Sequence, residues 1–170
     1  SPPCDVSAPL AVVYTFDELA AGNFQDKILV LCGELTQQPV DAYFLNAVYL
    51  PESSRRIGLL LREKMPLAVL LVCQNPGYDT LMIEDMRLPI PSTTLATDAA
   101  LMLLENASAP ARLVIKSTSR PGSTNHVLGL WQPTADQRRI MISAHFDTRF
   151  GTIGAFDNAS GVAALLAICE

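Results

Sequence analysis

Long apolar runs and charge are both scarce in this 170-residue sequence. The longest apolar runs cover residues 65–73 and 159–169, which is short of the ~20 residues that a membrane-spanning helix needs. Only 17% of the residues are charged, the net charge is -5, and Lys and Arg form no cluster. We therefore expect no membrane segment in this chain and no binding to nucleic acid. Hydrophobic residues make up 49%, which favours a packed globular interior.

Cysteine pairs are also missing. The four cysteines are far apart and none lies in a Cys-x-x-Cys pair, so neither a structural zinc site nor a disulfide framework is indicated. Cys32, Cys73 and Cys169 lie inside apolar runs and are predicted to be core residues. Cys4 is predicted to be exposed.

The first part of the chain alternates short apolar runs with helical patterns. Residues 27–32 read as a buried strand that Gly33 ends. Residues 51–64 then have apolar residues at helical spacing, with Ser53 or Ser54 as the expected cap. Pro66 ends this helix, and residues 67–73 form a second buried strand, which completes a βαβ-like unit.

A second helix and another strand are expected further on. Residues 88–95 contain two prolines and are predicted to be extended. A helix over residues 99–106 follows, with Thr97 or Asp98 as its cap, and then a strand over residues 112–117.

The last fifty residues have a different character. Two strands are predicted at residues 125–131 and 139–145, joined by a hairpin-length connection at 132–137. A glycine-rich loop, 151–161, leads into residues 162–169. That segment is apolar nearly all round, so it is expected to be buried by further protein.

The residues that indicate chemistry are His145, Asp147 and Asp157. His145 ends an apolar strand, the edge at which α/β sheets bind ligands, and Asp157 follows twelve residues later. An imidazole and a carboxylate suit zinc. Asp147 lies two residues after His145, where its carboxylate would accept the far N–H of a ligating ring. A His-x-Asp pair alone is more often ordinary structure; the combination with the glycine loop and apolar helix favours a site.

Residues 141–166 closely resemble the zinc aminopeptidase family that includes glutamate carboxypeptidase and transferrin receptor. The shared pattern is an apolar strand ending in His-x-Asp, then Gly-Ala-x-Asp-Asn-x-Ser-Gly and a helix. The resemblance implies a peptidase that hydrolyses terminal peptide bonds of a peptide substrate with two zinc ions. It implies that His145 is a ligand of one zinc, that Asp157 bridges both, that Asp147 orients His145, and that the Asp157–Asn158 peptide is cis.

The earlier segments resemble a protease-associated domain, which is often inserted into these peptidases before the His-x-Asp strand. The expected fold is therefore α/β: a protease-associated-like β/α domain at residues 1–118, then the first strands and helix of a zinc-peptidase sheet at residues 119–170. The family resemblance favours a secreted or periplasmic location.

The resemblance accounts for only half of a peptidase site. The family's Glu-Glu pair, a further acidic ligand and a second histidine have no match here, and Glu170 reads as a helix-surface residue. His126 is expected to be packed or at a strand edge rather than a ligand. We therefore expect a fragment whose partner is the remainder of the catalytic domain and which is inactive alone. The alternatives are a non-enzymatic, receptor-like relative and a protease-associated interaction module.

Overall fold

The computed structural model describes residues 1–40, 51–75, 81–83, 88–130, 140–148 and 152–169. The chain divides into two compact units, Ser1–Pro121 and Gly122–Glu170. Together they confirm the α/β class. Within the described residues, no helix is both long and apolar enough to cross a membrane.

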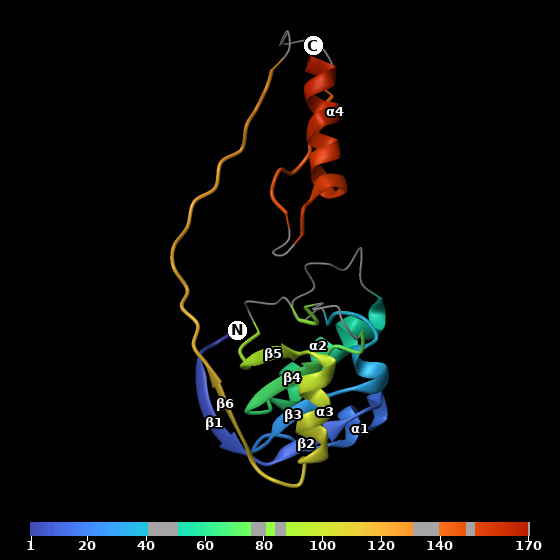
Figure 1. Cartoon of the computed structure of the whole chain (residues 1–170), viewed down its shortest axis with the longest axis vertical. Helices are drawn as coiled ribbons and strands as arrows, with labels where there is room; N and C mark the ends of the chain where they lie inside the picture. Colours follow the sequence, from blue (N-terminus) through green and yellow to red (C-terminus); the bar gives the residue numbers. More distant parts are fainter. Residues whose placement is uncertain (41–50, 76–80, 84–87, 131–139, 149–151, 170) are drawn as a thin grey trace. The chain divides into compact units, whose positions relative to one another are not determined.

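The first unit is built on a four-stranded parallel sheet with the strand order β2-β3-β4-β5 (Figure 1). The strands are β2 (Leu10–Val13), β3 (Ile28–Leu31), β4 (Ala68–Val72) and β5 (Ser92–Leu95). Because neighbours in the sheet are also consecutive and parallel, each connection has to cross a face of the sheet. The expected strands around residues 27–32 and 67–73 are confirmed as β3 and β4.

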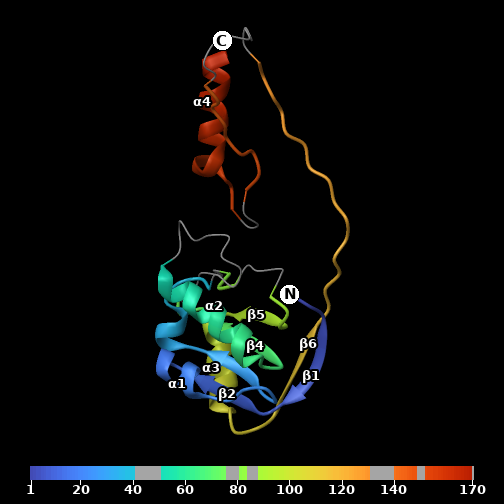
Figure 2. The same ribbon diagram turned by 180° about the vertical axis from the view of Figure 1, so that it is seen from behind.

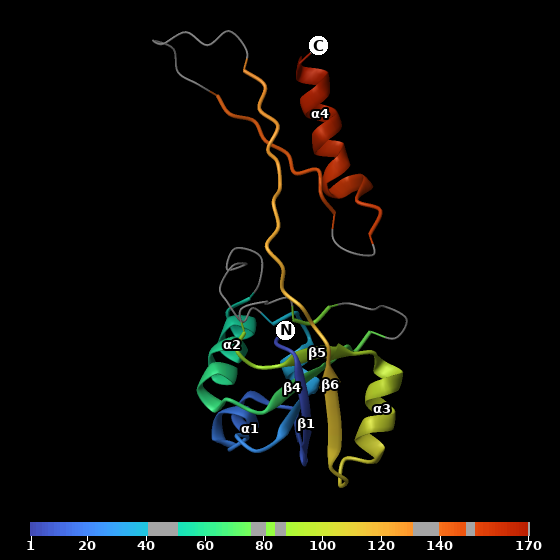
Figure 3. The same ribbon diagram turned by 90° about the vertical axis from the view of Figure 1, so that its left-hand side faces the viewer.

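Helices cover both faces of this sheet. Figure 3 shows α1 (Phe16–Ala21) and α2 (Glu52–Lys64) on one side and α3 (Thr97–Glu105) on the other. An antiparallel ribbon of β1 (Cys4–Ala8) and β6 (Ala111–Ile115) contributes to the same apolar cluster as α3. Figure 2 shows the molecule from behind, with α2 in front of the sheet.

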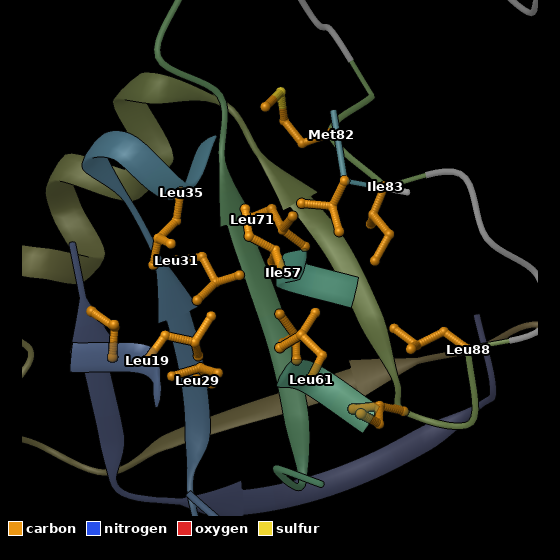
Figure 4. Packing of buried hydrophobic residues seen from close by; sticks show 14 of the residues in the cluster. Leu19, Leu29, Leu31, Leu35, Ile57, Leu61, Leu71, Met82, Ile83 and Leu88 are labelled. Atoms are coloured by element: carbon orange, nitrogen blue, oxygen red, sulfur yellow. The ribbon is translucent and has the colours of Figure 1, made fainter. Parts of the chain in front are cut away.

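The sheet separates two apolar clusters because successive side chains of a strand point to opposite faces. In β3, Leu29 and Leu31 enter the cluster that α1 and α2 cover, whereas Ile28 and Val30 enter the cluster under α3. All four are completely buried, as expected for a central parallel strand. Figure 4 shows the first cluster, in which side chains from α2 pack against β3 and β4.

The caps expected for both long helices are wrong. α2 starts after Pro51 without a side-chain cap, and Ser54 is buried within its first turn. α3 starts after Ala96 without a side-chain cap. The Thr97 hydroxyl instead donates to the carbonyl of Cys73 (2.7 Å), where it satisfies a backbone acceptor at the end of β4.

The N-terminal elements β1, β2 and α1 were not expected from the sequence. The signal for α1 is nevertheless present: Thr15 accepts from the Glu18 N–H (3.2 Å), while the Glu18 carboxylate accepts from the Thr15 N–H (3.1 Å). This reciprocal capping box is readable from a Thr followed three residues later by a Glu. β1 is less readable because its partner β6 lies about a hundred residues away in the chain.

The second unit contains α4 (Ser160–Cys169), preceded by a turn, η2 (Ala155–Ala159), in which Asp157 and Asn158 have non-helical backbone angles. The strands predicted at 125–131 and 139–145 are wrong for the residues that can be described: 125–130 and 140–145 form no strand and are largely exposed. The connection at 132–137 lies outside the described residues. An apolar segment becomes a strand only when a neighbouring strand takes up its backbone groups, and the described part of this unit provides none.

The cysteines show how burial differs along the chain. Cys32 and Cys73 are buried as predicted, but Cys4 is half-buried and Cys169 is exposed, so those two expectations are wrong. Cys169 belongs to α4, none of whose residues is buried. Burial raises the pKa of the Cys32 thiol to about 11.

We expect thiol reagents to distinguish these cysteines. At pH 8, iodoacetamide should modify Cys169 first and Cys32 last, because only the accessible thiolate reacts. Mass spectrometry of tryptic peptides at successive times checks the order. Equal rates for Cys32 and Cys169 in the folded chain would contradict the burial of Cys32, which directly follows β3.

Candidate metal centre

His145 and Asp157 meet in the second unit. His145 comes from the extended segment 140–148, and Asp157 comes from η2. The Nε2 atom of His145 lies 2.8 Å from Oδ1 of Asp157. The chain between them therefore folds back on itself, and the two side chains that the sequence nominated as metal ligands are in contact.

The other ring nitrogen of His145 faces Asp147. Nδ1 is 3.0 Å from the backbone carbonyl oxygen of Asp147 and 3.3 Å from its carboxylate Oδ1. Carbonyl and carboxylate oxygens can only accept, so a protonated ring donates from Nδ1 to Asp147 and from Nε2 to Asp157. A zinc ion bound at Nε2 would replace the proton on that nitrogen, while Nδ1 keeps its own proton against Asp147. The backbone of Asp147, which sequence reasoning did not consider, thus acts together with its carboxylate.

These oxygens raise the pKa of His145. The largest cause is the bond to the Asp147 carbonyl, which outweighs the opposing effect of desolvation, and the hydrogen bond and charge of Asp157 add to it. The negative environment therefore attracts positive charge to this ring.

Gly154 allows the loop after Thr148 to turn back, so that Asp157 comes close to His145. Its φ is +67°, a left-handed conformation that favours glycine. A Cβ at this position would collide with the side chain of Thr148. The Gly154 carbonyl accepts from the N–H of Ala159 (3.0 Å), which closes the turn that carries Asp157.

The residues after Asp157 start α4. The Asp157–Asn158 peptide is cis, as the family resemblance implied. The Asn158 side chain accepts from the N–H of Gly161 (3.2 Å), and the Ser160 hydroxyl donates to the Phe156 carbonyl (2.6 Å). Sequence reasoning missed this capping role of Asn158, although an Asn three residues before a helical N–H is its usual signal.

The donor pair fits a zinc ion in type and nearly in spacing. Two ligand atoms that each lie ~2.1 Å from zinc at a tetrahedral angle are about 3.4 Å apart, so Nε2 and Oδ1 have to separate by roughly 0.6 Å. Both side chains are accessible, with 52% of His145 and 83% of Asp157 exposed. No group of three or more potential metal ligands occurs in the described residues, and Glu170 lies outside them.

Comparison with known protein families gives a match, which lies in this second unit. Residues 126–170 match the model of peptidase family M28. This C-terminal segment is similar to peptidase family M28. The M28 match contains His145, Asp147 and Asp157, and it assigns the segment to a family of metallopeptidases. No curated protein and no solved structure matches the chain.

The M28 segment exposes many large apolar side chains. Ile140 and Phe156 are both 89% exposed, and the others include Val127, Leu128, Leu130, Met141, Ile153, Leu166 and Ile168. Large exposed apolar patches mark interaction sites on soluble proteins. The contrast with the closed core of the first unit is one of packing, since both sequences are rich in apolar residues.

Proposed function

We propose that this chain carries the first half of the active site of a zinc-dependent exopeptidase. The observation that carries the proposal is the 2.8 Å approach of His145 Nε2 to Asp157 Oδ1 within the M28 segment. An imidazole and a carboxylate converging from two arms of one loop form half of a typical zinc site.

Each of the three residues has a distinct task in this proposal. His145 would hold one zinc through Nε2, since Nδ1 faces the Asp147 carbonyl and can keep its proton there. Asp157 would hold zinc through its carboxylate, whose two oxygens suit a ligand shared by two ions. Asp147 fixes the tautomer and orientation of His145, as carboxylates and carbonyls behind zinc ligands do. Zinc at such a site polarises the scissile carbonyl and acidifies water.

The remaining ligands and the general base come, in this proposal, from a further part of the catalytic domain. Two protein ligands are too few, because a catalytic zinc normally has three. The exposed apolar side chains of the M28 segment support the same idea, since a catalytic sheet packed on them would bury α4. Peptides are the proposed substrates, and we expect cleavage at a chain terminus.

We further propose that residues 1–118 form a protease-associated-like binding domain. The supporting observation is that the first unit has its own closed core with helices on both faces of the sheet. A module that packs by itself is able to cover a neighbouring active site or hold a partner. The contact between His145 and Asp157 favours the enzyme over a receptor-like relative, which has no use for a zinc ligand pair.

Zinc titration of the purified 170-residue chain tests the metal site. We expect weak zinc binding that His145→Ala reduces at least tenfold, a loss in the range seen when metal-site groups are removed. Competition with a fluorescent zinc chelator measures the affinity.

The matched control is His126→Ala. It removes the other histidine of the same unit, which is exposed, and should leave zinc affinity unchanged. Equal affinities for wild type and His145→Ala would place the metal elsewhere, for example on the exposed thiol of Cys169, and would overturn the proposed site.

A further inference from the structure

Thr148 contacts the returning arm of the metal loop at two points. Its hydroxyl donates to the backbone carbonyl of Thr152 (3.3 Å). Its methyl side lies against Gly154: a Cβ built on that glycine would collide with Thr148 Cγ2 and lie 2.8 Å from Thr148 Cβ. The hydroxyl and the methyl group of Thr148 therefore both contact the part of the loop that leads to Asp157.

Both arms lead directly to the candidate ligands. On one side, Thr148 follows Asp147, whose oxygens contact the His145 ring. On the other side, Gly154 begins the turn that carries Asp157, and a Cβ on Gly154 would lie 3.3 Å from the Asp157 carbonyl oxygen. Gly154 thus lies next to both Thr148 and the backbone of Asp157.

We propose that Thr148 is a positioning residue of this site. Its contacts with Thr152 and Gly154 hold Asp157 within reach of His145 Nε2. A β-branched side chain suits this task because its χ1 angle is restricted, so hydroxyl and methyl point in set directions. The zinc part of this inference rests on the proposed function; the contact between His145 and Asp157 does not.

Thr148 variants separate the two contacts. Thr148→Ser keeps the hydroxyl, Thr148→Val keeps the methyl, and Thr148→Ala removes both. The matched control is Ile153→Ala in the same loop, since the Ile153 side chain is 93% exposed. All are made in the full 170-residue chain, and far-UV circular dichroism verifies that the first unit stays folded.

The first measurement is the nitrogen NMR shift of the His145 ring in metal-free protein, assigned with His126→Ala. Asp157→Ala supplies the reference for a lost contact. We expect Thr148→Ala to move the Nε2 shift towards that reference and to lower zinc affinity about tenfold. Serine and valine should give intermediate values, and Ile153→Ala should match wild type.

The outcomes separate this inference from the proposed function. If Thr148→Ala keeps both the ring shifts and the zinc affinity of wild type, the positioning role is wrong, even where His145→Ala abolishes zinc binding. If wild type binds no zinc but Thr148→Ala still moves the ring shift, the positioning role stands and the metal site fails.

Discussion

Leu61→Ala is expected to lower the free energy of unfolding of the first unit by about 2–5 kcal/mol. Leu61 is completely buried on α2 and belongs to the cluster between this helix and the sheet, where Figure 4 shows it near Ile57. Truncation removes apolar contacts and leaves a cavity that the neighbouring strands fill only in part. Urea denaturation followed by circular dichroism measures the loss.

Leu59→Ala is the matched control for this prediction. Leu59 lies two residues earlier on the same helix but is 47% exposed. The change in intrinsic helix propensity is the same for both substitutions, so their difference isolates burial. We expect Leu59→Ala to change stability by no more than about 0.5 kcal/mol. Equal losses at the two positions would mean that α2 does not pack on the sheet through Leu61.

Asp157→Asn is expected to abolish peptide hydrolysis by the proposed enzyme. The amide has the size of the carboxylate but no charge, so it cannot bridge two cations, and its NH2 group would face the His145 ring. Loss of metal polarisation removes several kcal/mol of transition-state stabilisation, which corresponds to a fall of about a thousandfold or more in kcat/KM. The assay uses the protein with the rest of its catalytic domain.

The control for charge alone is Asp98→Asn, which makes the same chemical change at an exposed position of α3 and should leave hydrolysis unchanged. Peptides blocked at one or both termini test the exopeptidase assignment. Cleavage of a doubly blocked peptide contradicts it, and full activity of Asp157→Asn contradicts the metal role of that residue.

Local signals predicted the centre of the first unit well. β3 and β4 are short apolar runs that end at Gly33 and at the residues after Cys73, and α2 has helical spacing before Pro66. Each of these signals lies within the element itself. The C-terminal end of α2 follows the same logic: Met65 takes a left-handed conformation (φ 45°) and its N–H donates to the Leu61 carbonyl (2.9 Å), one residue before the proline.

Features that depend on distant partners were predicted less well. Thr97 was expected to cap its own helix, but its hydroxyl satisfies the carbonyl of Cys73, the residue that follows β4. The apolar segment at 140–144 reads as a central strand, yet it has no strand to pair with in the described residues. Residue propensity and hydrophobic periodicity do not show which distant segment will supply the hydrogen-bond partners of an element.

By itself, the sequence determined the α/β class, the main elements of the first unit, and the identity of the candidate ligands His145 and Asp157 and of Asp147 beside them. These follow from residue types at short spacing, which the chain carries locally. Only the tertiary structure decided that His145 Nε2 reaches Asp157, that Nδ1 lies 3.0 Å from the Asp147 carbonyl oxygen, and that Thr148 lies against Gly154. Those distances depend on how a loop turns back on itself, and that is set by backbone conformation and excluded volume rather than by any single residue's chemistry.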